Sequence, residues 1–369
     1  MDLRSSDSPD FERLIASLGG DEALVASARA TGAFLRARAV KSPRDLLRLV
    51  LMYGPGGLSL RTEAAMAAEA GISDLSNVAL LNRIRGAAGW LETLCAALLN
   101  RTTAPRELPA AASQGLRSVN IIDASVIEAP GRAMNWRLHL SWDARCERIA
   151  AARFTTVKAG ERLDLLDTEP DQVIVADRGY PQPNGLANLL ARGSEVLVRI
   201  TWNSLCLTNP DGTPLDWLAL CETARDGGLE TPVLVRKPRG RFEPLPLRLV
   251  MIPKPAELTE PGRARAKREN ARGQRRTIDP RTLACAEHLI VLTSLPETVT
   301  AERILTLYRL RWQVELAFKR MKSLLHIDRL PAKDPDLAKA WLYAHLLIAL
   351  IAEDYIAPDD ALPPDALPP

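Results

Sequence analysis

Two stretches, Val119-Asn-Ile-Ile-Asp123 and Val173-Ile-Val-Ala-Asp177, share one pattern, in which a short apolar run ends directly on an aspartate. Short apolar runs rich in β-branched residues predict buried strands. A carboxylate at the end of such a strand is costly to bury unless it is paired or bound to a metal ion. Strand ends are also where α/β folds place ligand sites. Either aspartate alone is better explained as a turn or cap residue, so the interpretation rests on the pair.

Further strands and helices are predicted on both sides of these stretches. Trp136, Leu138, Leu140 and Trp142 alternate with polar residues and predict a second strand, and residues 149–155 predict a third, which completes an antiparallel meander. The other predicted elements are a helix at 184–191, strands at 196–200, 233–235, 247–252 and 288–293, and a long helix at 300–325. This order predicts an α/β fold with a mixed sheet. Its core comprises residues 117–200 and 288–353, and a β-rich insertion at 201–287 interrupts it.

Residues 1–100 are rich in Ala and Leu at helical spacing, which predicts an all-helical N-terminal domain. Within it, a short helix at Thr62–Ala70 and a second helix carrying Arg83 and Arg85 form a possible helix-turn-helix. The second helix would enter a major groove, and the two arginines are then candidate DNA-binding residues. A plain helical hairpin explains the pattern equally well. Residues 101–116 contain two prolines and several polar residues and are interpreted as a linker.

Net charge does not identify a class of partner, because 48 Lys and Arg stand against 45 Asp and Glu, a formal +3. Charge is concentrated locally instead. Between Arg263 and Arg276 seven residues are basic and one is acidic, which is equally typical of a DNA contact and of a solvated linker within the insertion. Residues 354–369 are acidic and proline-rich and predict a disordered tail.

The five cysteines are odd in number and lack the paired spacing of zinc sites, which suits a reduced cytoplasm. The N-terminus shows no basic-then-apolar signal, and the apolar stretch at Ala338–Ala352 is interrupted and too short to span a bilayer. These features predict an intracellular protein with no membrane partner.

The long helix predicted at 300–325 gathers polar residues on one face. Tyr308, Arg311, Glu315 and Lys322 fall within an arc of roughly 60° at about 100° per residue. Glu315 is suited to hold a metal ion, while Arg311 and Lys322 are suited to bind phosphate oxygens. Taken alone, the pattern is better explained by helical ion pairs such as Arg311 with Glu315, which stabilise a helix only slightly.

Two strand-end aspartates and one helical glutamate provide the oxygen donors that Mg²⁺ prefers, and Mn²⁺ is a substitute. Two such ions about 4 Å apart activate a water or a 3′-hydroxyl and stabilise the leaving oxygen of an in-line displacement at phosphorus. This chemistry needs no nucleophilic side chain. The sequence accordingly shows neither a Ser-His-Asp or Cys-His pattern nor a phosphate-binding glycine-rich loop.

At these residues the chain resembles the DDE transposases of bacterial insertion sequences, in the branch called insertion sequence four. The resemblance rests on Asn120-Ile-Ile-Asp-Ala-Ser125, Trp136-Arg-Leu-His139, Ala176-Asp-Arg-Gly-Tyr180 and the segment Tyr308–Lys322 with Trp312 inside it. It implies an RNase H-like catalytic core with the insertion between the second aspartate and the glutamate. The residues implied to be catalytic and to bind the metal ions are Asp123, Asp177 and Glu315. The residues expected to contact DNA are Tyr308, Arg311, Lys322 and Arg178.

The resemblance also implies partners and a place in the cell. Such transposases act as homodimers or larger assemblies on terminal inverted repeats of double-stranded DNA, and they join the 3′ ends of the element to a target. The expected location is the bacterial cytoplasm, at the nucleoid. Some relatives use an aromatic residue of the insertion to hold a base out of the stack, but Trp202 and Trp217 are better explained here as core residues.

Three hypotheses for the activity follow. The leading one is an active transposase that cleaves element ends and transfers strands with the help of metal ions. The second, motivated by the unusual tail, is a truncated, inactive transposase that only binds inverted-repeat DNA through residues 40–100. The third is a nuclease of the same fold without strand transfer.

Overall fold

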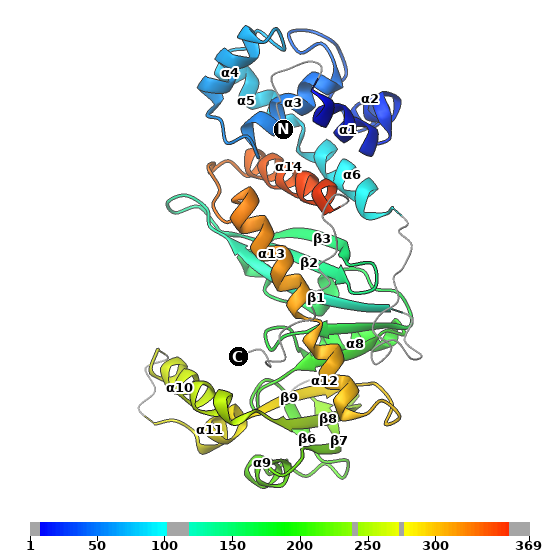
Figure 1. Cartoon of the computed structure of the whole chain (residues 1–369), viewed down its shortest axis with the longest axis vertical. Helices are drawn as coiled ribbons and strands as arrows, with labels where there is room; N and C mark the ends of the chain where they lie inside the picture. Colours follow the sequence, from blue (N-terminus) through cyan, green and yellow to red (C-terminus); the bar gives the residue numbers. More distant parts are fainter. Residues whose placement is uncertain (1–7, 102–117, 238–242, 273–276, 354–369) are drawn as a thin grey trace.

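The computed structural model describes residues 8–101, 118–237, 243–272 and 277–353 (Figure 1). The predicted tail at 354–369, and the predicted linker at 101–116 apart from its first residue, lie outside these ranges. The N-terminal helices lie at one end of the long axis, the segment 201–287 lies at the other, and the sheet extends between them (Figure 1).

Within the described residues, six helices precede the sheet. They are α1 (Pro9–Ser17), α2 (Gly20–Ala30), α3 (Pro43–Tyr53), α4 (Leu60–Glu69), α5 (Asn77–Gly86) and α6 (Ala88–Leu99). Three of them begin at serine caps: the side chains of Ser42, Ser59 and Ser76 each accept a hydrogen bond from the backbone amide three residues further on. The predicted pair of short helices corresponds to α4 and α5, which pack against each other.

The helix α14 (Pro335–Glu353) joins the N-terminal helices to the rest of the chain. It packs mainly against α6, and also against α5 and α3 (Figure 1). By length and hydropathy α14 is the one helix of the described residues that is able to cross a membrane, but 67% of its most apolar window is buried inside the protein. Side chains such as Leu342 and Leu347 have no exposed surface. This degree of burial is typical of a core helix.

Glu63 on α4 is a buried acid without a partner. Its side chain has no exposed surface, and neither carboxylate oxygen has a hydrogen-bond partner among the described residues. Burial raises the pKa of Glu63 from 4.5 to about 8. Between these two values the folded protein keeps a proton that the unfolded chain loses. The free energy of unfolding contributed by this group therefore falls as pH rises through that range.

We expect Glu63→Gln to remove this pH dependence, because the neutral amide has no proton to lose. Relative to wild type, the variant should gain about 1.4 kcal/mol of stability per pH unit between about pH 5 and about pH 8. Urea unfolding across that range measures the gain. The exposed Glu69 ends the same helix, so Glu69→Gln is the matched control. If the two variants followed the same pH profile, a buried, protonated Glu63 would be excluded.

A nine-stranded mixed sheet forms the centre of the described protein, with the strand order β3-β2-β1-β4-β5-β9-β8-β7-β6. The strands are β1 (Ser118–Ile127), β2 (Trp136–Asp143), β3 (Arg148–Thr156), β4 (Gln172–Ala176), β5 (Glu195–Arg199), β6 (Cys206–Thr208), β7 (Leu229–Arg236), β8 (Leu245–Pro253) and β9 (His288–Thr293). β1 pairs in parallel with β4, and β4 with β5, whereas the other neighbours are antiparallel. The predicted meander and the predicted mixed α/β class are confirmed.

Helices cover both faces of the sheet. On β4, Val173 and Val175 face the core that α13, α14 and the N-terminal helices share, while Ile174 and Ala176 face a second core with α8 (Pro183–Ala191). Burial on both faces explains why β4 is an unbroken apolar run rather than an alternating one.

The segment 201–287, predicted as a β-rich insertion, contributes helices as well as strands. Its strands extend the central sheet, because β8 pairs with β9 from Arg248↔Thr293 to Pro253↔His288. Its helices are α9 (Trp217–Ala224), α10 (Ala256–Arg272) and α11 (Pro280–Ala286).

The basic segment Arg263–Arg276 is helical through Arg272, as part of α10, so the prediction of a linker is wrong for these residues. Residues 273–276 lie outside the described ranges. Ala, Arg, Lys and Glu are strong helix formers, and Arg265 forms an ion pair of 3.0 Å with Glu269 one turn further on. Helix propensity and this ion pair therefore keep the segment helical, despite the repulsion among its basic residues.

The long helix predicted at 300–325 is two helices, α12 (Ala301–Arg309) and α13 (Trp312–Leu325), joined by a tight turn. In the turn, the amides of Leu310 and Arg311 bond to carbonyls only three residues earlier, at 3.2 and 3.1 Å. Such 3₁₀ geometry advances each residue further around the axis than an α-helix does. The single polar face predicted for Tyr308–Lys322 is therefore divided, and Tyr308 and Arg311 turn inward, with 0% and 6% exposure.

Candidate active site

The two aspartates lie side by side, but only Asp177 follows the end of its strand. β1 continues past Asp123 to Ile127, so the prediction that this strand ends at Asp123 is wrong. β1 and β4 pair in parallel, and their last paired residues are Ile122 and Ala176. Asp123 and Asp177 follow immediately, so they occupy matching positions on neighbouring strands, about 4.8 Å apart in the hydrogen-bonding direction. β4 ends there, and the chain turns with the amide of Tyr180 donating to the carbonyl of Asp177 at 3.1 Å. The parallel pairing thus brings the two acids together at the point where β4 ends.

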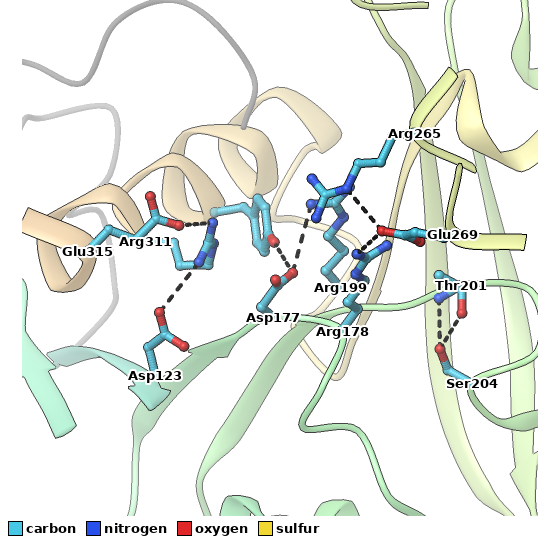
Figure 2. A network of polar contacts seen from close by, with 11 residues as sticks. Asp123, Asp177, Arg178, Arg199, Thr201, Ser204, Arg265, Glu269, Arg311 and Glu315 are labelled. Carbon is cyan, nitrogen blue, oxygen red and sulfur yellow. Dashed lines mark hydrogen bonds and ion pairs between the residues drawn. The ribbon is translucent and has the colours of Figure 1, made fainter. Parts of the chain in front are cut away.

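The guanidinium of Arg311 lies among the carboxylates (Figure 2). Its Nη1 is 3.7 Å from Oδ2 of Asp123, and its Nη2 donates a hydrogen bond to Oε1 of Glu315, one turn along α13. Arg311 also attracts Asp177. One buried cation therefore pairs with two of the three acids that the sequence singles out and lowers the pKa of the third.

Asp177 has further partners on its other side. The hydroxyl of Tyr308 donates to Oδ1 of Asp177 at 3.1 Å, and Nη1 of Arg199 lies 3.8 Å from the same oxygen (Figure 2). Tyr308 is fully buried, so its contact in the structure is with a carboxylate rather than with the surface where DNA would lie. It fixes the orientation of Asp177.

The two aspartates have opposite pKa shifts. Burial raises the pKa of Asp123 to about 6, against the lowering effects of the Ala124 amide and Arg311. Burial also raises the pKa of Asp177, but Arg311, Arg199 and the hydroxyl of Tyr308 together outweigh it and hold that pKa below its usual value. Asp177 is thus the more firmly ionised member of the pair, because it has Arg199 and Tyr308 as partners in addition to the influence of Arg311, whereas Arg311 is the cation beside Asp123.

An open cleft of about 490 Å³ lies beside these groups. Its polar lining includes Asp123, Glu315 and Lys322. Lys322 therefore lines the same cleft as two of the acids. Among the described residues, no three acidic, His or Cys side chains lie close enough to hold one metal ion as they stand. The carboxylate donors suit Mg²⁺, and the positive charge between them comes from Arg311.

The other residues predicted to contact DNA lie away from this cluster. Arg85 on α5 pairs with Asp334 at 3.2 Å, and the guanidinium of Arg83 lies 5.8 Å from the ring of Phe34. Both therefore lie with the N-terminal helices (Figure 1). Arg178 follows Asp177 but turns to Glu269 of α10, at 3.1 Å.

The two tryptophans of the insertion are held within the protein. The indole N–H of Trp202 donates to Oγ1 of Thr282 at 3.0 Å, and the guanidinium of Arg281 lies 3.9 Å from its ring centroid. Trp217 is buried in the second core. Both positions agree with the interpretation of these tryptophans as structural.

Arg199 and Lys254 were not predicted as site residues. Arg199 lies 3.8 Å from Asp177, and Lys254 lines a cleft together with Arg199. Both residues lie at strand ends, because Arg199 ends the apolar run of β5 and Lys254 follows the end of β8, so the pattern that identified the acids also identifies bases. A site for a phosphodiester needs both.

The two aspartates of the sheet, the glutamate of α13 and the bases around them agree with one class of protein, the DDE transposases. The family described as Transposase DDE domain matches residues 114–351, most of the chain and all of the residues around Arg311. The chain therefore belongs to this family of enzymes, which carry out DNA transposition and generally use divalent metal ions.

Within that class the chain is a member of the insertion-sequence-four branch. It is 38% identical over 357 residues to InsL, named as a transposase for insertion sequence element IS186A of Escherichia coli (strain K12), covering 95% of this chain and 94% of the relative. It is 37% identical over 358 residues to the transposase for insertion sequence element IS421 of Escherichia coli, with the same two coverages. The relationship extends over nearly the whole of both chains.

Proposed function

We propose that this chain excises its element by cutting DNA at the terminal inverted repeats and joins the 3′ ends to target DNA. One observation carries the proposal: Asp123, Asp177 and Glu315, which are separated in sequence, lie around the guanidinium of Arg311, which pairs with Asp123 and Glu315 and lowers the pKa of Asp177. A cluster of partly buried acids around one cation is an arrangement that accepts metal ions. Neighbouring bases suit a polyanionic substrate.

We assign the metal site to Asp123, Asp177 and Glu315, with Mg²⁺ as the ion and Mn²⁺ as its substitute. Bound there, the ions supply a Lewis acid and an activated oxygen nucleophile for displacement at phosphorus. Tyr308 and Arg199 orient Asp177, and Lys322 binds a phosphate at the mouth of the cleft. Arg311 neutralises the acids before the ions arrive, a role that its burial supports better than a contact along the duplex.

The architecture suggests how the chain divides its tasks. The proposed RNase H-like core comprises residues 117–200 and 288–353, and the segment 201–287 interrupts it. The core includes β1 to β5 with α8, followed by β9 and α12 to α14. The helices of residues 8–101 are the proposed DNA-binding part, with α4 and α5 as its candidate helix-turn-helix. Synapsis of two element ends calls for a homodimer or larger assembly, and such an enzyme works in the bacterial cytoplasm on nucleoid DNA.

End cleavage tests the proposal. Purified protein and Mg²⁺ are incubated with a labelled duplex that carries the DNA flanking its own gene, and the products are mapped at nucleotide resolution. We expect cuts at the repeat ends, followed by joined products when target DNA is added. Cuts without joined products would favour the nuclease, and a bound but uncut duplex would favour the transposase that only binds DNA.

A further inference from the structure

A second cleft, of about 650 Å³, lies between β5, α10 and α11. Its lining residues Arg199 and Arg265 lie on the opposite side of Asp177 from Asp123 and Glu315 (Figure 2). We call it the Lys254 cleft. Its lining includes the cations Arg178, Arg199, Lys254 and Arg265 and the acid Glu269. Figure 2 shows Arg178, Arg199, Arg265 and Glu269 grouped beside Asp177. The cleft therefore carries a marked excess of positive charge and adjoins the proposed catalytic groups.

Close packing of two helices builds this cleft. Any side chain at position 262 of α10 would place its Cβ 2.9 Å from the carbonyl oxygen of Ala286 at the end of α11. Because Gly262 has no side chain, the two helices can approach closely. This approach positions Arg265 and Glu269 along the wall of the cleft. The backbone amide of Lys254 donates to the carbonyl of Glu287 at 2.8 Å and fixes the lysine at the floor.

Lys254 differs from the arginines around it. Arg178 and Arg265 share Glu269, at 3.1 and 3.0 Å, and Arg199 lies 3.8 Å from Asp177. By contrast, the ammonium of Lys254 has no carboxylate partner within the described part of the chain, although the residue is half-buried. Burial first, then Arg199, Arg265 and Arg178, lowers the pKa of Lys254 to about 8. An anion in the cleft would relieve this repulsion.

We propose that Lys254 binds a backbone phosphate of the DNA strand adjacent to the bond that is cut. The proposal rests on the proposed function and extends it to a specific subsite. Arg199 lines the cleft and also contacts Asp177, so a strand held at the carboxylates has a continuous row of cations to follow. Grooves lined by such cations track a nucleic-acid backbone without reading its sequence.

The test compares Lys254→Gln with Lys237→Gln, which removes the same charge from an exposed residue that lies outside the cleft. DNA binding is measured without divalent ions, over a range of salt, on the inverted-repeat duplex and on a scrambled duplex. We expect Lys254→Gln to weaken binding to both duplexes about tenfold, as loss of one charge-assisted contact does, and to reduce the salt slope by about one. Lys254→Arg should keep wild-type affinity.

Ethylation interference locates the contact. Wild type should be sensitive to ethylation of a phosphate next to the cut, and Lys254→Gln should lose that sensitivity alone. Its unfolding temperature should not fall, since it removes a repelled charge. Equal affinities for Lys254→Gln and Lys237→Gln, together with wild-type end cleavage, would overturn the phosphate subsite but leave the proposed function standing. A wild type that binds no DNA end would overturn both.

Discussion

Glu315→Gln is expected to lower the rate of end cleavage by about a thousandfold, equivalent to about 4 kcal/mol of transition-state stabilisation. The amide keeps the size of the side chain and a hydrogen-bond acceptor for Arg311, but it removes the negative charge that a divalent ion requires. Asp123→Asn and Asp177→Asn should have effects of similar size, because the three acids act as one group. Single-turnover cleavage of a pre-bound duplex is the appropriate measurement.

Binding to the repeat ends separates a catalytic role of Glu315 from a structural one. We expect Glu315→Gln to bind the duplex within about twofold of wild type when divalent ions are absent, since the substitution removes no cation that contacts phosphate. The exposed Glu302 on the neighbouring helix α12 provides the control, because Glu302→Gln makes the same change away from the cluster. If Glu315→Gln lost DNA binding and cleavage to the same extent, Glu315 would have a structural role instead of a catalytic one.

Arg311→Ala is expected to destabilise the protein when metal ions are chelated. The substitution leaves Asp123, Asp177 and Glu315 around an empty position, and removing one partner of a buried ion pair typically costs several kcal/mol. Asp123 and Glu315 keep 21% and 37% of their side-chain surface exposed, and solvent weakens their interaction with Arg311. We therefore expect the free energy of unfolding to fall by a smaller amount, about 2 to 3 kcal/mol. Urea unfolding in chelator measures the loss.

Added divalent ions distinguish this explanation from simple loss of packing. Mg²⁺ or Mn²⁺ should stabilise Arg311→Ala more than wild type, because the ions replace the missing positive charge and bind the folded state only. Arg225→Ala is the control, since Arg225 forms an exposed pair with Glu222 and its loss should cost less than about 1 kcal/mol with no response to metal. A variant that ions do not rescue would show that Arg311 contributes contacts rather than charge.

The elements that the sequence predicts correctly have a strong local signal. The alternation of apolar and polar residues at Trp136–Trp142 and the unbroken apolar run of β4 both identify strands. Each pattern shows directly which faces of the strand are buried. Asp123 and Asp177 are identified only as a pair, since either aspartate alone is better explained as a turn or cap residue. Their adjacency then follows from the parallel pairing of β1 with β4.

The features that sequence reasoning misses depend on geometry or on distant partners. The turn at Leu310–Arg311 moves Arg311 from the predicted polar face into the acids, and bonds of 3₁₀ type in an otherwise helical pattern leave no compositional trace. The pairing of β8 with β9 joins the insertion to the core sheet across a connection that contains α10 and α11. The sequence of neither strand identifies the strand that it pairs with, because one apolar strand can pair with another until the whole sheet is assembled.

The position of α14 determines when the protein can finish folding. The helices α3, α5 and α6 are made well before α14, the helix Pro335–Glu353 against which they pack. During translation the faces that α14 covers have no partner until that helix has been made, and an exposed apolar face on a nascent chain is a site for chaperones or for misassembly. A chain that is truncated before Pro335 therefore contains the first helices but lacks the helix that covers their apolar faces.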